Sequence, residues 1–434
     1  MIRTIEEIST VRDGKSRTFW FGFFFFSAVV SATALVSIAL SNHRAGFEVC
    51  ALVRENYFRA GEAEVKAFLE RCDREAAAEP ATLSRRHTIE RINRRLKGLK
   101  TSHLQVHTPA QNRQIWTNEG LDTGIRARRV EGEIVIHQLI EESPGVRAGL
   151  RAGDAVVSVN GADADEEIVI STPGLFKIAR GAKLFTVDVE VEEISEDLGP
   201  RLTELPNGVG YLRIGSFLPH YFADESWAEI AGKLKNHSAF VIDVRGNAGG
   251  SFPAMLRALS PFFCKDVKVG ELWTTAEGIE RGAPTSLPDD LRASVQLEAL
   301  KSSGGFLQLK SFPMDVCTDR PVVVLADEST SSVSEIFSEA LSSRANSRVW
   351  GTPTAGQVVM ARWFEVGSLG GGDFAMSIPI AGYRTREGVA IESDGLLPEK
   401  IMVYDLESAL AGKDDWLEEA HAFVSGKISR SVSK

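Results

Sequence analysis

The sequence predicts an α/β protein in which a core of strands and helices follows an N-terminal helical region and a β-rich insertion. Three observations predict this class. Beyond residue 208, short β-branched runs alternate with amphipathic helix patterns. Before that core, short strand patterns alternate with turns across residues 118–195. The preceding residues are helical and highly charged, so we expect a helical region over 45–117, the insertion over 118–195 and the core over 200–425.

Length and composition indicate an ordinary globular protein of several domains. The chain has 434 residues, of which 43% are hydrophobic and 25% are charged, and this length predicts two or three domains. The net charge of -10, with no long basic patch, argues against a nucleic-acid partner. The histidines and cysteines lack metal-ligand spacing, and no nucleotide or organic cofactor is implied.

The N-terminus carries an uncharged, mostly apolar segment over residues 19–41, after a mixed-charge leader over residues 1–18. A helix of this length spans about 30 Å, which matches a bilayer. One interpretation is a single-pass anchor in a bacterial-type inner membrane, with the leader kept in the cytoplasm. The other is a signal peptide cleaved near residues 39–41. Both place the rest of the chain in the periplasm or outside the cell.

Four cysteines agree with an oxidising compartment. Cys50 and Cys72 lie at equal distances from a turn at residues 59–61, so an antiparallel helical hairpin would bring them level. Cys264 and Cys317 form a second candidate pair. Disulfides are one interpretation, and buried free thiols are the other.

The insertion contains a second recognisable pattern: Ala148–Leu150, then Gly153–Asp154, a β run, and Asn160–Gly161. This pattern resembles a PDZ domain, which implies that an extended peptide is added as a strand while backbone N–H groups hold its terminal carboxylate. By position, the resemblance assigns those donors to the loop that contains Leu121, Gly124 and Ile125. That loop departs from the usual glycine-rich pattern, which leaves the ligand preference open.

In the core, the turns that follow two predicted strands contain residues suited to ligand binding or catalysis. The predicted strand 239–244 leads into the glycine-rich turn Asp243–Gly250, where a backbone can approach a ligand closely. No Lys-Ser/Thr follows these glycines, so the turn is not a phosphate-binding loop. The predicted strand 321–326 leads into a hydroxyl-rich turn and then a helix that restarts at Glu335. Such an elbow can expose a serine beside a helix N-terminus, although serines also simply cap helices.

Together these motifs resemble the tail-specific (C-terminal processing) peptidases and the related tricorn core. The resemblance covers residues 45–405 and implies a crotonase-like α/β peptidase core. It implies that Ser332 is the nucleophile, and that the N–H of Val333 and one from Gly249–Gly250 form an oxyanion hole. Four ordered motifs carry it: Asp243–Gly250, Ser332–Glu335, Gly351–Gly356 and Glu392–Pro398.

The general base departs from the pattern. Many tail-specific peptidases use a lysine where this chain has Gln357, and no lysine occurs between Arg320 and Glu399. Either another base serves or the enzyme is inactive. Histidine is the natural substitute, and the segment that ends at His103 is similar to the tricorn segment that supplies the base.

The resemblance therefore implies a triad of Ser332, His103 and Glu392, in which the carboxylate orients the imidazole. His220 is the runner-up base, and His107 is a further histidine of the same region. Two functions remain open. One is a membrane-anchored serine endopeptidase that recognises C-terminal tails of exported polypeptides. The other is an inactive pseudopeptidase that acts as a peptide-binding adaptor.

Overall fold

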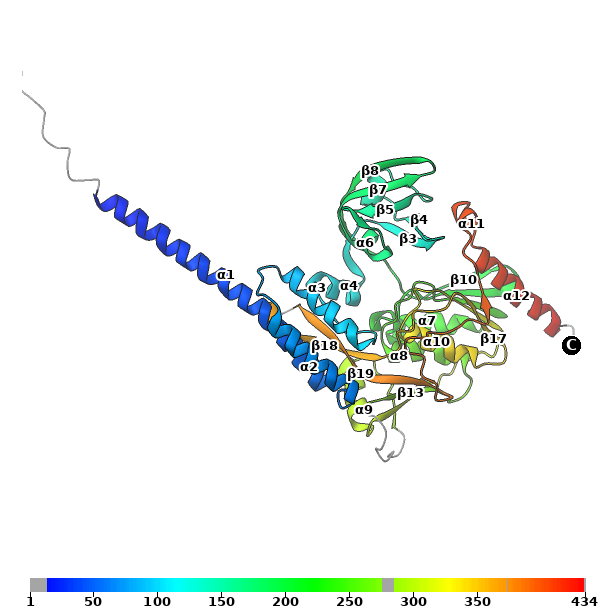
Figure 1. Ribbon diagram of the computed structural model, residues 1–434. Helices are drawn as coiled ribbons and strands as arrows, with labels where there is room; N and C mark the ends of the chain where they lie inside the picture. Colours follow the sequence, from blue (N-terminus) through cyan, green and yellow to red (C-terminus); the bar gives the residue numbers. More distant parts are fainter. Residues whose placement is uncertain (1–13, 275–284, 372, 433–434) are drawn as a thin grey trace, which may run out of the picture.

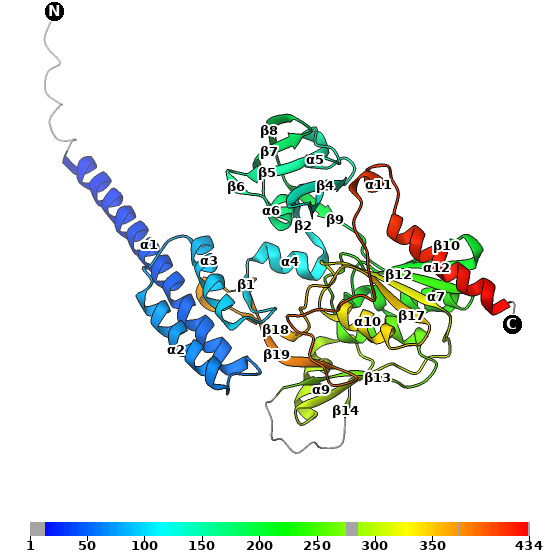
Figure 2. The same ribbon diagram turned by 45° about the vertical axis from the view of Figure 1, so that its right-hand side comes forward.

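The computed structural model describes residues 14–274, 285–371 and 373–432; the side chains of residues 14–32, 167 and 428–432 lie outside the description. Figure 1 shows three parts: N-terminal helices on one side, a β-rich lobe, and a larger α/β core that ends in α12 on the side away from α1. Figure 2 shows the same arrangement after rotation, with α4 leading into the β-rich lobe.

The N-terminal helices form a hairpin that packs on the core. The Cys50–Cys72 disulfide joins α1 to α2, as predicted from the equal spacing. The apolar faces of these helices bury Val49, Leu69 and Ile92 against β19 residues such as Met376. The elements are α1 (Gly14–Asn56), α2 (Ala63–Ala78), α3 (Arg85–Leu96), η1 (Lys97–Leu99), β1 (Gln105–His107) and α4 (Pro109–Thr117).

The predicted membrane segment 19–41 forms part of α1. Where side chains are described, no helix offers an apolar stretch of the length that a membrane crossing requires. The side chains of residues 19–32 lie outside the described part of the structure, and this finding does not cover them.

The insertion folds as a separate six-stranded sheet in the order β3-β4-β5-β7-β8, with β6 paired to β5, which leaves β3 at one edge. Helix α6 lies against β3, and Ile136, Phe176 and Ile178 fill the core. The elements are β2 (Glu119–Asp122), β3 (Ile125–Val130), β4 (Glu133–Leu139), α5 (Pro144–Arg147), β5 (Ala155–Val159), β6 (Ala162–Asp163), α6 (Glu166–Ser171), β7 (Gly174–Arg180), β8 (Lys183–Val189) and β9 (Glu192–Ser195).

The core is built on a mostly parallel sheet in the order β10-β11-β12-β16-β17-β20. Its β-branched strands are buried on both faces, as expected for parallel strands covered on each side. Helix α12 covers one face, while α8 and α10 cover the other. The elements are β10 (Arg201–Leu205), η2 (Pro206–Gly208), β11 (Val209–Arg213), η3 (Pro219–Phe222), α7 (Asp224–Leu234), β12 (Ala239–Asp243), α8 (Phe252–Leu259), η4 (Ser260–Phe262), β16 (Val322–Ala326), α10 (Val333–Ser342), β17 (Ser347–Gly351), β20 (Lys400–Ile401), α11 (Leu406–Leu410) and α12 (Asp415–Val432).

A second sheet, β1-β19-β13-β15-β14 with β18 against β19, packs on the far side of α8 and α10. The disulfide Cys264–Cys317 is the second pairing that the sequence predicts. Strand β1 joins this sheet by pairing with β19, which brings the segment after α3 to the core. The elements are β13 (Lys268–Trp273), β14 (Thr285–Ser286), α9 (Ala293–Ser302), β15 (Phe306–Lys310), β18 (Met360–Glu365), η5 (Gly367–Leu369) and β19 (Ala375–Thr385).

Candidate active site

The nucleophile elbow lies between β16 and α10. Ser332 has φ 61° and ψ -132°, a backbone conformation that is costly for a residue with a Cβ. It is 8% exposed. Helix α10 begins at Val333, two residues before the predicted start, because Ser332 occupies the cap position. The N–H of Val333 is at the first helical position and therefore has no acceptor within the helix.

A buried carboxylate holds this elbow in place. Glu335 is fully buried, and its side chain accepts a hydrogen bond from the N–H of Ser332 at 3.0 Å. Burial raises the pKa of Glu335, while its hydrogen-bond donors act in the opposite direction. The same carboxylate accepts three bonds from the loop after β17, from Thr354 Oγ1 at 2.6 Å, Gly356 N at 2.7 Å and Gln357 N at 2.8 Å.

The glycine-rich turn after β12 packs directly against Ser332. A Cβ on Gly249 would lie 2.6 Å from the Cβ of Ser332 and 3.0 Å from its hydroxyl oxygen, so only glycine fits there. The side chain of Asn247 accepts the N–H of Gly249 at 2.9 Å, and its carbonyl accepts the N–H of Ser331 at 3.0 Å. Of the two glycine donors expected for the oxyanion hole, Gly249 is therefore engaged and Gly250 is the better candidate.

His103 lies in the turn before β1, with a positive φ of 56°. Its Nδ1 pairs with the hydroxyl of Ser102 at 2.9 Å. Burial, together with the smaller effect of the neighbouring His107, lowers the pKa of His103 to about 4. The imidazole is therefore neutral at pH 7, which is the form that can accept a proton. Asn93 fixes the segment by bonding both the N–H and the carbonyl of Val106.

Glu392 lies next to this turn but does not contact the imidazole as predicted. One of its oxygens accepts the N–H of Ser102 at 2.8 Å, and the other accepts the N–H of Val358 at 2.7 Å. Among the described contacts, neither oxygen bonds to the ring of His103. The carboxylate instead ties the His103 turn to the loop that Glu335 anchors to Ser332. It positions the turn through the backbone because both of its oxygens are taken by N–H groups.

The alternative residues occupy less suitable places. His220 is exposed on η3, with its ring 4.0 Å from that of Tyr221 between centroids. The side chain of His107 is buried and bonded to Ser377 at 2.9 Å. Ser334 is completely buried, so it cannot meet a substrate in this conformation. Gln357 is exposed at the position where the resemblance expects lysine.

The predicted peptide-binding loop has its donors engaged. Gly124 donates its N–H to the carboxylate of Asp122 at 2.6 Å, and Ile125 donates to the hydroxyl of Thr123 at 3.2 Å. Leu121 lies in β2, opposite Glu193 of β9. The prediction that Gly124 and Ile125 offer free donors is therefore wrong for this conformation, because nearby side chains satisfy both groups.

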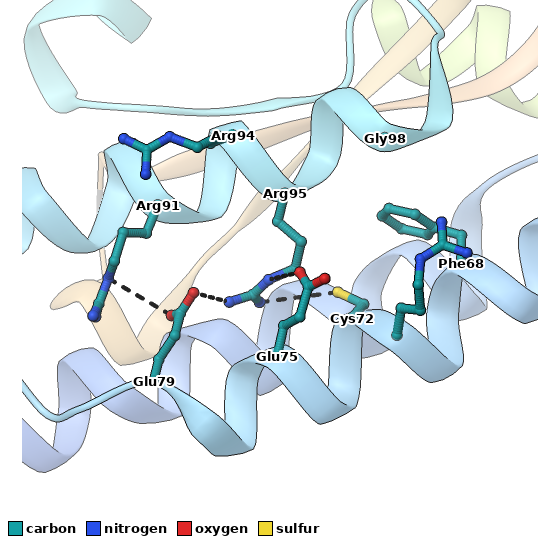
Figure 3. A pocket seen from close by; sticks show the side chains of 9 residues that line it. Phe68, Cys72, Glu75, Glu79, Arg91, Arg94, Arg95 and Gly98 are labelled. Carbon is teal, nitrogen blue, oxygen red and sulfur yellow. Dashed lines mark hydrogen bonds and ion pairs between the residues drawn. The ribbon is translucent and has the colours of Figure 1, made fainter.

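A pocket of about 330 Å³ lies between α2 and α3, away from these residues (Figure 3). Arg95 pairs there with Glu79 at 2.5 Å, and Arg91 lies 3.7 Å from the same carboxylate. Its lining contains none of the predicted catalytic residues. These ion pairs connect the end of α2 to α3 near Cys72. In the described part of the chain, no cluster of side chains suits a metal ion.

Sequence reasoning missed three residues that shape the site: Ser102, Asn247 and Glu335 in its bridging role. Asn247 offered a signal, because Asn two residues before glycine commonly bonds the backbone of a turn. Glu335 offered only the weaker signal of an acid in the first turn of a helix. Nothing in the sequence pattern pointed to Ser102.

Comparison with known proteins shows similarity to processing proteases. Residues 208–401 match the model of peptidase family S41. The chain is 22% identical to a carboxyl-terminal-processing protease of Synechocystis sp., over 75% of this chain and 73% of that protein. It is also 22% identical to the carboxy-terminal processing protease CtpA of Bacillus subtilis, over 64% of this chain and 54% of that one. The solved structure of mature CPAF complexed with lactacystin has the same fold, with a TM-score of 0.63, 14% identity and coverage of 91% and 99%.

Proposed function

We propose that this protein is a serine endopeptidase with Ser332 as nucleophile and His103 as general base, because residues 208–401 match the model of peptidase family S41. The observation that carries the proposal is the elbow itself. Ser332 is held in a strained conformation, with the first N–H of α10 and the Gly249–Gly250 turn beside it. This arrangement supplies a nucleophile and an anion site in one place.

In the proposed reaction, neutral His103 takes the hydroxyl proton while the oxygen of Ser332 attacks the peptide carbonyl. The oxyanion that forms accepts hydrogen bonds from the N–H groups of Val333 and Gly250, worth roughly 3 kcal/mol each in comparable sites. The imidazolium then donates its proton to the leaving amine. Water, deprotonated by the same ring, hydrolyses the acyl-enzyme and regenerates the hydroxyl.

Support for His103 comes from the hydrogen bonds around it. Glu392 joins the N–H of Ser102 to that of Val358, and the neighbouring Gln357 is bonded to Glu335. Because Glu335 also bonds Ser332, the two proposed catalytic residues sit on segments connected by one continuous network. Ser102, rather than a carboxylate, pairs with Nδ1, and when its hydroxyl accepts from Nδ1–H the other ring nitrogen is left to take a proton.

The insertion and the N-terminus complete the proposal. The insertion acts as a PDZ-type module that engages polypeptide substrates, which an edge strand β3 beside α6 supports. Residues 19–41 anchor the protein in a bacterial-type inner membrane, with the bulk of the chain in the periplasm. Two disulfides support an oxidising compartment.

A second function rests on the missing lysine. With Gln357 exposed and, among the described residues, no carboxylate bonded to the ring of His103, the core would be inactive and the protein would serve as a peptide-binding adaptor. Turnover of unfolded substrates separates the two functions.

The test is labelling by a fluorophosphonate probe in the full chain. Wild type and Gln357→Ala should label, Ser332→Ala should not, and His103→Ala should lose labelling by roughly a hundredfold or more. His220→Ala is the matched histidine control and should label like wild type. Full labelling of His103→Ala together with loss in His220→Ala would assign the base to His220 instead.

A further inference from the structure

The loop at the start of β3 already contains the group that a PDZ-type loop is built to capture. Capture of a peptide C-terminus needs free backbone N–H groups that converge on a carboxylate. Here Asp122 supplies a carboxylate from within the loop. Its side chain is 5% exposed and accepts the N–H of Gly124 at 2.6 Å.

The guanidinium of the neighbouring Arg126 is also engaged in ion pairs. Arg126 contacts both oxygens of Asp122, each at 3.1 Å, and donates to Glu196 at 2.5 Å. A terminal carboxylate arriving here would find the guanidinium shared between two acids and would face their negative charge. Like charges at such short range repel.

Thr123, in the same loop, donates both its N–H and its hydroxyl to helix α6. Thr123 donates its N–H to the carbonyl of Ile170 at 2.8 Å and its hydroxyl to the carbonyl of Val169 at 2.9 Å. Farther along β3, the N–H of Arg129 donates to the side chain of Glu166 at 2.8 Å. Helix α6 is therefore bonded to the loop before β3 near one end and to β3 itself near the other.

Space around the loop is also filled. A Cβ on Gly124 would lie 2.0 Å from the Cβ of Ser143, and the N–H of Gly145 bonds the carbonyl of Thr123 at 2.8 Å. The N–H of Gly124 therefore bonds Asp122 in a tightly packed part of the loop, and it is not available to a ligand while that bond is made.

We propose that Asp122 is a built-in carboxylate that excludes the C-terminal carboxylate of a substrate, so that the insertion engages internal polypeptide segments. This inference rests on the proposed function and names its substrate class: chains selected without regard to a free C-terminus. A bound segment would pair with the edge of β3 after α6 releases it, and no terminal charge would have to enter the loop.

The test compares one unfolded, fluorescent peptide in two forms, with a free C-terminal carboxylate and with a C-terminal amide. Binding is measured to the full chain carrying Ser332→Ala, which prevents hydrolysis. We expect the two dissociation constants to agree within about twofold. Adding Asp122→Asn removes the charge but keeps an acceptor for Gly124, and Asp122→Ala frees that N–H. Asp122→Ala should bind the free acid roughly tenfold more tightly than the amide, and Asp122→Asn should show a smaller preference because the N–H of Gly124 stays engaged.

Asp188→Asn, an exposed acid on β8 of the same insertion, is the matched control and should leave the ratio unchanged. A tenfold preference of the unsubstituted loop for the free acid would overturn the proposal, as would no binding of either form. Equal affinities in both Asp122 variants would remove Asp122 from its role. If the variants fail to fold, as thermal melting would show, the ratio measured with the native loop still decides. Loss of all hydrolysis by wild type with binding intact would refute the peptidase alone.

Discussion

Replacing Glu335 with alanine tests how the nucleophile elbow is held. The carboxylate is completely buried and accepts four hydrogen bonds, so its removal leaves three backbone N–H groups and one hydroxyl without their acceptor. The hydroxyl of Thr354 can rotate, but the N–H groups cannot. At roughly 1 kcal/mol for each unsatisfied N–H, we expect a loss of about 3 kcal/mol in the free energy of unfolding.

The substitution should slow the chemistry as well as lower the stability. Ser332 keeps its positive φ because its N–H is bonded to Glu335 and its neighbours are packed on Gly249. Without that bond, the strain of order 1–3 kcal/mol can relax and carry the hydroxyl away from the helix N-terminus. We expect the rate of fluorophosphonate labelling to fall by roughly a hundredfold.

Urea unfolding and labelling kinetics measure both quantities. Glu298→Ala on α9, an exposed glutamate, is the control and should change stability by less than about 0.5 kcal/mol. Glu335→Gln should lie between wild type and alanine, because an amide retains one acceptor oxygen. The reasoning is refuted if Glu335→Ala stays within about 1 kcal/mol of wild type and labels at the same rate.

Three further outcomes follow from the structure. With the pKa of His103 lowered to about 4 by burial and His107, kcat/KM should stay level down to about pH 5 and fall near pH 4; a midpoint near 6.5 contradicts the base assignment. Burial and the nearby Glu387 raise the pKa of Glu339 to about 7, so its contribution to stability is present below pH 4.5 and lost as pH rises to 7. That loss is at most about 3 kcal/mol, and Glu339→Gln should abolish it in pH-dependent unfolding. Replacing Cys50 and Cys72 together by alanine should cost about 3 kcal/mol in calorimetry, since the disulfide closes a separation of 22 residues; an unchanged Tm would contradict this.

Local patterns carried much of the fold. The buried strands β12 and β16 read as apolar runs, and the turns after them read as glycine-rich and hydroxyl-rich, because these features depend on neighbouring residues. The helix boundary at Val333 was missed by two residues, since a cap and a first turn look alike in sequence.

Contacts between distant segments could not be predicted in the same way. The resemblance implied that Glu392 contacts the ring of His103, whereas the carboxylate bonds Ser102 and Val358. Only folding decides which of several nearby donors a carboxylate takes. The same limit applies to Asp122, whose acidity was visible but whose bond to Gly124 depends on the path of the loop.

The bond between Ser102 and Glu392 joins residues 290 positions apart, with the whole insertion between them. Nearly the entire polypeptide is therefore synthesised before Glu392 can bond the turn that contains His103. Until that bond forms, a growing chain contains Ser332 but lacks the contact that holds the turn of His103 in place. Under the proposed function, a truncated chain that ends before Glu392 should therefore lack peptidase activity.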